Sequence, residues 1–153
     1  MKQITNANEA NRRINRRIAA ASVKHMSNTK WRKLFTAIHS VPRLGEVAIK
    51  FINDDRLFTG SIPGPDFDHK DNTGECGGIS FQPFAHIEFV QIPNLYHTSL
   101  DGPRYPNTEI QNDIDSFVER LENTGSFPIR HYDNGITIIG YEWAANDGTI
   151  QNA

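Results

Sequence analysis

Residues 127–143 have the sequence FPIRHYDNGITIIGYEW, the stretch that says most about the fold. Two segments with apolar residues, 127–133 and 136–143, flank the dipeptide Asn134-Gly135. Asn-Gly supplies the two positive-φ residues that a tight type I′ turn requires, so the stretch predicts a β-hairpin. Because hairpin strands pair antiparallel, a mainly antiparallel sheet is expected.

The segment before this hairpin, from about Thr108 to Asn123, has the strongest helical periodicity of the chain. Its apolar residues recur at i, i+4, i+7, i+8 and i+11, which places them on one face of a helix. Glu109 and Asp113 near the start suit the positive end of the helix dipole, and Gly125 is the expected terminator. The apolar positions are Ile110, Ile114, Phe117, Val118 and Leu121.

A second core helix is predicted near residues 27–38. Ser27, Asn28 or Thr29 can cap it, because their side-chain oxygens accept hydrogen bonds from free backbone amides of the first turn. Its apolar face repeats at i, i+3, i+4 and i+7. That face consists of Trp31, Leu34, Phe35 and Ile38.

Two further segments have strand character. Residues 46–52 alternate apolar and polar positions, and residues 57–59 are a candidate for pairing with them. Residues 79–92 are the other segment, and between them lies a predicted loop, 60–78; another loop is predicted over 93–106. In the second strand segment, simple alternation puts Ile87 and Phe89 on one face and His86, Glu88 and Val90 on the other.

These elements predict an α+β fold, with a mainly antiparallel sheet of four to five strands and two to three helices packed on one face. Two parts are expected: a basic helical arm over residues 1–26 and a single α+β domain over 27–153. The arm has a thin apolar stripe and four arginines. It is either a solvated helix or floppy arm, or a contact for nucleic acid or an acidic surface. Met26 offers an alternative start of a shorter protein. The stripe is Ile14, Ile18 and Ala21, and the arginines are Arg12, Arg13, Arg16 and Arg17.

Charge is divided along the chain. Residues 1–50 contain 11 Lys and Arg against 2 Asp and Glu, whereas residues 51–153 contain 5 against 16. An acidic body suits a basic partner, such as a protein that binds or cleaves nucleic acid. No secretion signal opens the sequence, and no apolar stretch approaches the length of a membrane span, so a cytoplasmic protein is expected.

Candidate catalytic and metal sites are weak. The acidic stretch 66–71 has Asp71 and Gly77 where a calcium loop needs Gly and Glu, so a solvated loop facing a basic protein is favoured over a metal site. Cys76 follows Glu75, which would raise the pKa of its thiol. Neither a phosphate-binding glycine loop nor zinc-ligand spacing is present in the sequence. The expectation is a non-enzyme without cofactor or metal.

Short blocks of sequence resemble a small bacterial family of uncharacterised function. The most distinctive are Asn28-Thr-Lys-Trp-Arg-Lys-Leu-Phe35 and Gly135-Ile-Thr-Ile-Ile-Gly140. The resemblance covers residues 27–141 in pieces and fails over 53–78, 93–108 and the arm. In size, acidity and lack of a catalytic set, the chain also resembles immunity proteins of contact-dependent inhibition and other polymorphic toxin systems. That resemblance implies a cytoplasmic protein that binds and neutralises a cognate toxin domain, often a nuclease.

The prediction for function is therefore a non-catalytic immunity protein. Carboxylates of the loop 60–78 and of the predicted helix 108–123 would oppose the basic cleft of the toxin: Asp66, Asp68, Asp71, Glu75, Asp113, Asp115, Glu119 and Glu122. One alternative is nucleic-acid binding by the arm and the cluster Lys30-Arg32-Lys33. The other is a small hydrolase or RNase built from His86, Glu88, His97 and His131. The oligomeric state is left open.

Overall fold

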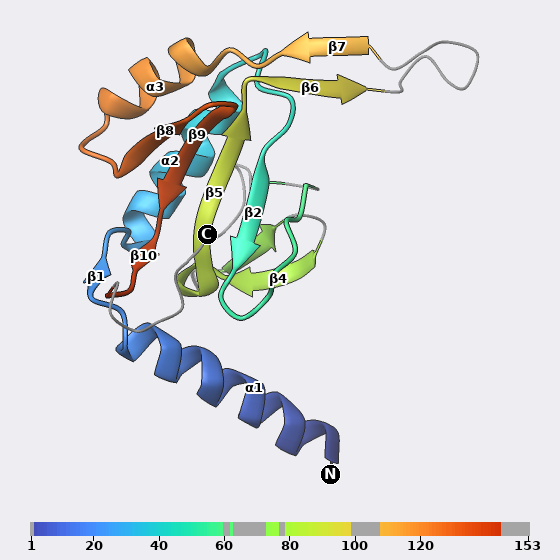
Figure 1. The fold of residues 1–153 in the computed structure, drawn as a ribbon, viewed down its shortest axis with the longest axis vertical. Helices are drawn as coiled ribbons and strands as arrows, with labels where there is room; N and C mark the ends of the chain where they lie inside the picture. The colour runs from blue at the N-terminus through green and yellow to red at the C-terminus, as the bar shows by residue number, and fades with distance from the viewer. Residues whose placement is uncertain (1, 60–61, 63–72, 77–78, 99–107, 145–153) are drawn as a thin grey trace.

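The computed structural model describes residues 2–59, 62, 73–76, 79–98 and 108–144 (Figure 1). Within them lie three α-helices and a central antiparallel sheet, which confirms the α+β prediction. The helices are α1 (Lys2–Ala19), α2 (Asn28–Ser40) and α3 (Ile114–Glu122), and a 3-10 turn, η1, spans Phe84–His86. The strands are β1 (Val23–Lys24), β2 (Ala48–Phe51), β3 (Thr73–Cys76), β4 (Ile79–Pro83), β5 (Ile87–Pro93), β6 (Leu95–Thr98), β7 (Thr108–Gln111), β8 (Ile129–Tyr132), β9 (Gly135–Ile139) and β10 (Tyr141–Glu142).

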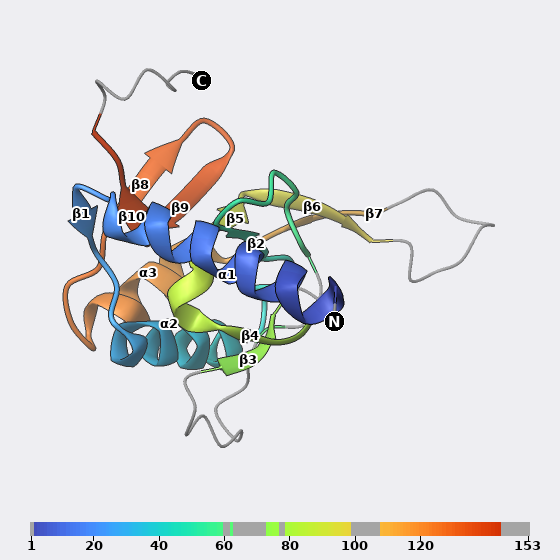
Figure 2. The same cartoon turned by 90° about the horizontal axis from the view of Figure 1, so that it is seen from below.

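The four central strands are arranged in the order β2-β5-β9-β8, and each neighbouring pair is antiparallel. Three two-stranded ribbons accompany this sheet: β1 with β10, β3 with β4, and β6 with β7. Helices α2 and α3 cover one face of the sheet, whereas α1 crosses one end of it (Figures 1 and 2). The β6–β7 ribbon extends outward from the opposite end (Figure 1).

The hydrophobic core lies between the sheet and the pair α2 and α3. All four predicted apolar residues of α2 are buried, and Ser27 is the observed N-cap, accepting a hydrogen bond from the backbone N–H of Lys30 at 3.1 Å. Phe117 and Leu121 of α3 are fully buried against them. Burying a large apolar side chain stabilises a fold by roughly 1.5–3 kcal/mol, so this layer dominates the stability of the domain.

The faces of β5 differ from the prediction because the strand contains a bulge. Phe89 lies opposite Lys50 but Ile87 lies opposite Phe51, which leaves Glu88 as an extra residue. An extra residue shifts the alternation by one, so Ile87 and Val90 both face the core and are fully buried. The prediction that Ile87 shares a face with Phe89, opposite Val90, was therefore wrong.

The predicted hairpin is confirmed as β8 and β9, but its turn is shifted by one residue. Tyr132 pairs with Gly135, so the two-residue turn consists of Asp133 and Asn134. Asn134 does not have the positive φ that the predicted type I′ turn requires; of the non-glycine residues described, Asn53 alone has a positive φ. The prediction of hairpin and strands was correct, whereas the turn type was wrong.

Three loop or helix assignments from the sequence also change. Residues 108–111 form β7, which pairs with β6, so α3 begins only at Ile114 and the predicted loop 93–106 contains a strand. Residues 73–76 form β3 instead of loop. The expected pairing of residues 57–59 is confirmed by an isolated bridge between Phe58 and Ile49.

The chain joins the body of the fold before residue 27. Ile14 and Ile18 of α1 are partly buried, as the apolar stripe predicted. After α1, strand β1 pairs with β10, and Met26 is buried in the core with 2% of its surface exposed. Within the described residues, no helix combines the length and the apolarity needed to cross a membrane.

Candidate functional site

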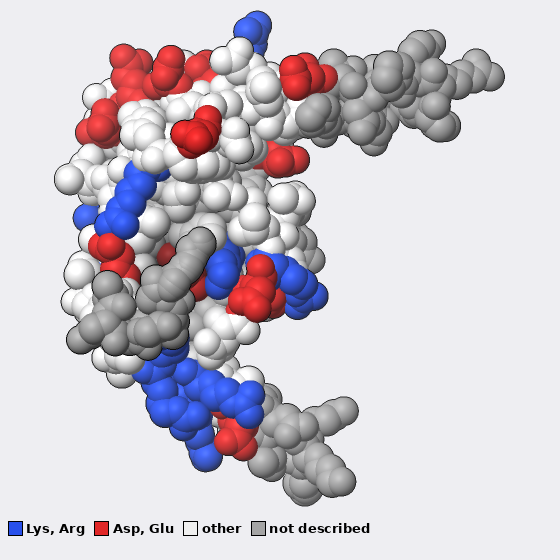
Figure 3. Space-filling model, in the orientation of Figure 1, with Lys and Arg blue, Asp and Glu red and all other residues white. Residues whose placement is uncertain are grey.

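Three of the predicted partner-binding carboxylates form one row on α3. Asp115, Glu119 and Glu122 are spaced i, i+4 and i+7, and all three are exposed. This spacing places them on one flank of the helix, while Phe117 and Leu121 point into the core. We call this row the acidic stripe. Red side chains gather over α3 in Figure 3, at the opposite end of the molecule from α1.

Asp113 has a different position from the stripe, because it is the N-cap of α3. Its carboxylate accepts a hydrogen bond from the backbone N–H of Ser116 at 3.2 Å. Hydrogen bonds from Ser116 lower the pKa of Asp113, and the nearby cations Arg43 and Arg120 contribute in the same direction. Asp113 therefore stays ionised while it starts the helix that carries the stripe.

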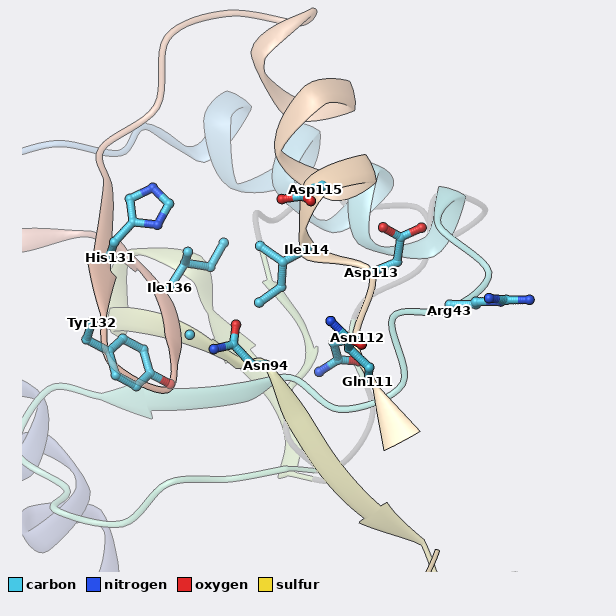
Figure 4. A pocket seen from close by; sticks show the side chains of 11 residues that line it. Arg43, Asn94, Gln111, Asn112, Asp113, Ile114, Asp115, His131, Tyr132 and Ile136 are labelled. Carbon is cyan, nitrogen blue, oxygen red and sulfur yellow. The ribbon is translucent and has the colours of Figure 1, made fainter. Parts of the chain in front are cut away.

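A cavity of about 490 Å³ lies at the start of α3 (Figure 4). His131 and Tyr132 of β8 lie on one side of it, and Asp113 and Asp115 lie on the other (Figure 4). Arg43, from the loop after α2, also lines the cavity. Asp115, the first residue of the acidic stripe, therefore lies at the wall of this cavity.

Asn112, which also lines this cavity, positions it through a buried amide. Its side chain is 3% exposed, and its Oδ1 accepts a hydrogen bond from the backbone N–H of Gly45 at 2.8 Å. Its Nδ2 donates to the carbonyls of Pro93 at 2.8 Å and Glu46 at 3.1 Å. The amide thereby joins the loop after α2, the end of β5 and the start of α3. Sequence reasoning missed it, because the letters around residue 112 do not distinguish a buried asparagine from a loop asparagine.

The other four predicted acidic residues precede β4 in the sequence. Asp66, Asp68 and Asp71 lie outside the described residues. Glu75 is in β3, but its side chain also lies outside the described part. Their role in partner binding remains a prediction, and the geometry of the site rests on α3.

The histidines of the alternative RNase site do not come together where the structure describes them. His86 belongs to η1, before β5 begins, whereas His131 lies level with Ile92 near the far end of β5, through their common neighbour Ile136. Burial lowers the pKa of His86. Glu88 pairs with the Nζ of Lys50 at 2.7 Å.

The fourth member of that set, His97, lies in β6, and its side chain is outside the described part. Over the side chains that are described, no group of three or more His, Cys, Asp or Glu residues could hold a metal ion.

The basic residues divide into separate surfaces. Arg12, Arg13 and Arg16 are exposed on α1, where Figure 3 shows blue side chains gathered. In the predicted cluster on α2, the Nζ of Lys30 lies 5.8 Å from the ring centroid of Phe127, and Arg32 and Lys33 line a groove toward α3.

Comparison with known proteins gives one match. A model described as "Family of unknown function (DUF6678)" matches residues 13–145, a range that includes half of the predicted arm and both predicted loops. Neither the curated proteins nor the solved structures contain a match to the chain. The predicted resemblance to a family of unknown function is confirmed, and the resemblance to immunity proteins stays a prediction.

Proposed function

The chain belongs to the DUF6678 family, whose function is unknown, and from its surface we propose that it is a non-catalytic immunity protein. In this proposal it binds a cognate bacterial toxin domain in the cytoplasm and neutralises it. The single observation that supports this is the acidic stripe: three exposed carboxylates on one flank of α3, next to a cavity that Asp113 and Asp115 line.

The physical argument is charge complementarity. A toxin that cleaves nucleic acid needs a basic cleft to hold phosphate, and a row of carboxylates can occupy that cleft in place of the phosphates. The stripe extends about 10 Å along α3, at 1.5 Å per helical residue. Because α3 is anchored by buried Phe117 and Leu121, the row is held on a rigid support. Opposite charges also accelerate encounter, and this acceleration decreases as salt rises.

The first test is co-expression with the C-terminal domain of the protein encoded immediately upstream. We expect a complex that co-elutes in size-exclusion chromatography and restores growth of a host that the domain alone inhibits. Growth inhibition that persists with this chain present, together with separate elution, would contradict the proposal.

The second test addresses the stripe within that complex. Glu119→Gln with Glu122→Gln removes two carboxylates, and we expect association at low salt to slow about tenfold, with a weaker dependence on salt. Glu9→Gln with Asp55→Asn is the matched control, because both residues are exposed and lie outside α3. Equal rates for the two double variants would show that net charge, and not the stripe, governs association.

A second candidate function is nucleic-acid binding by α1, favoured by the exposed guanidinium groups of Arg12, Arg13 and Arg16. Deleting the whole arm would be a poor test, because β1 pairs with β10 and Met26 is buried. Replacing the three arginines by Gln in the full chain is expected to keep the fold, because all three side chains are exposed. Binding that uses α1 should weaken and lose about three units of its log–log salt slope, whereas unchanged binding would exclude α1.

A further inference from the structure

We infer that the groove between α2 and α3 binds a small phosphate-bearing molecule. The groove has a volume of about 390 Å³ and lies within the size range of small-molecule sites. Three cations line it, Arg32 and Lys33 from α2 and Arg120 from α3, and no carboxylate does. This inference does not depend on the proposed toxin partner.

The groove is separate from the acidic stripe although both involve α3. Arg120 follows Glu119 directly in sequence, but successive helical residues are turned by about 100°. The two side chains therefore lie on different flanks: Arg120 lines the groove toward α2, and Glu119 belongs to the stripe. One short helix thus presents a positive flank and a negative flank.

The lining suits a phosphate group joined to a carbon-rich body. A guanidinium presents a planar fork that donates two hydrogen bonds to one phosphate, and a lysine adds a compact charge. The Nζ of Lys33 donates to the carbonyl of Thr124 at 3.2 Å, which engages one of its three donors and holds it at the groove. Thr36 brings a hydroxyl on the same side of α2, and the small Ala37 leaves room for the body of the ligand.

The surroundings favour a small ligand over a nucleic-acid strand. A strand carries phosphates at regular spacing and needs a continued track of cations beyond one groove. Across α3 from the groove lies the acidic stripe, which would repel the phosphates that follow. The charge is therefore matched to one or two phosphates at a single position.

The test is a titration of the full chain, observed by backbone amide NMR, with three probes: inorganic phosphate, adenosine 5′-monophosphate and phosphate-free adenosine. Saturable shifts are expected at residues 32–36 and 120 with both phosphates, and adenosine should produce none. Arg120→Gln should weaken binding of the monophosphate about tenfold. Lys24→Gln, which removes one positive charge from an exposed position on β1, should leave it unchanged.

Lys33→Gln gives a second variant if Arg120→Gln fails to fold. Shifts that do not saturate, or equal weakening by Lys24→Gln, would overturn the inference in favour of non-specific charge. A short oligothymidylate that binds more tightly than the monophosphate, and that Arg120→Gln weakens equally, would overturn it in favour of a nucleic-acid strand.

Discussion

Position 135 needs a glycine because the backbone of the neighbouring strand β5 lies too close for a side chain, and not because the turn before it needs one. A Cβ atom at this position would lie 2.1 Å from the carbonyl oxygen of Ile92 and 2.8 Å from the Cα of Pro93. These atoms belong to the backbone of β5 and cannot rotate away. The glycine therefore allows β9 to approach β5 closely, which explains its presence although the turn precedes it.

Gly135→Ala is expected to lower the free energy of unfolding by about 2–3 kcal/mol, because the backbone of β5 must move. Gly125→Ala is the matched control: its φ is +154, close to the +158 of Gly135, but the nearest atom to its Cβ is a ring carbon of Phe127 at 3.7 Å. We expect a loss of about 1 kcal/mol there, from backbone strain alone. Urea denaturation measures both, and equal losses would exclude the close approach as the cause.

The hydrogen bonds of the buried Asn112 amide lead to a second prediction about stability. Asn112→Ala leaves the amide of Gly45 and the carbonyls of Pro93 and Glu46 without their side-chain partner. These three groups are only partly shielded from water, so each orphan should cost about 1 kcal/mol, the lower end of the range for unsatisfied groups. A total loss of about 2–4 kcal/mol is expected in urea denaturation. The exposed Asn94, replaced by Ala, should change stability by less than about 0.5 kcal/mol. Similar values for the two variants would contradict a structural role of the buried amide.

At the scale of elements, one carboxylate joins three strands. Glu142 of β10 accepts hydrogen bonds from the Nε2 of His25, just after β1, and from Arg130 of β8, both at 2.5 Å. The hydrogen bond from His25 and then that from Arg130 lower the pKa of Glu142 below its usual 4.5. The short ribbon of β1 and β10 is thereby fastened to the edge of the main sheet.

The sign of the pH dependence follows from this lowered pKa. The folded chain binds the proton of Glu142 more weakly than the unfolded chain, so its stabilisation is complete above pH 4.5 and is lost as pH falls through the folded pKa. Glu142→Gln should therefore cost about 1 kcal/mol at neutral pH and progressively less below pH 4.5. Urea denaturation across pH tests this, with Glu122→Gln on exposed α3 as control. A cost that does not change with pH would contradict the argument.

Elements were predictable where the signal is local. The four-residue apolar face of α2 and the Ser27 cap lie within one helix, so sequence alone was sufficient. The assignment of residues 108–111 to a helix was wrong because Ile110 fits both the apolar face of α3 and an alternating strand. Only the pairing with β6 decides between the two. The predicted faces of β5 were wrong for the same reason, since the bulge at Glu88 is defined by pairing with the neighbouring strand β2.

The same distinction between local signals and tertiary contacts applies to the candidate site. The acidic stripe was predictable, because helical spacing fixes which flank a carboxylate occupies. The buried role of Asn112 depends on the loop after α2 and on the end of β5. The placement of Arg120 beside Arg32 and Lys33 depends on how α3 packs against α2. No periodicity within either helix contains that information.

At the scale of the whole molecule, the division of charge in the sequence becomes a division in space. The arginines of α1 and the acidic stripe of α3 lie at opposite ends (Figure 3). A charged partner therefore meets a field that orients it before contact, with an effect that decreases as salt rises. This depends on α1 being held in one position relative to the sheet.

Trp143 contacts the last turn of α1. Its Nε1 donates a hydrogen bond to the carbonyl of Arg17 at 2.8 Å, and the guanidinium of Arg17 lies 4.1 Å from the centroid of its ring. Trp143→Ala removes both contacts, so α1 should open more often and trypsin should cleave after Arg12, Arg13 and Arg16 about tenfold faster.

Mass spectrometry of the first fragments measures that rate, and Tyr132→Ala, which removes a partly buried ring from β8, is the control. Cleavage of the body should keep its rate in both variants, because the core between the sheet and α2 does not include Trp143. If α1 is cleaved equally fast in all three proteins, its position does not depend on Trp143. The separation of charge would then be a time average over a moving arm, and the oriented approach of a partner would depend on α3 alone.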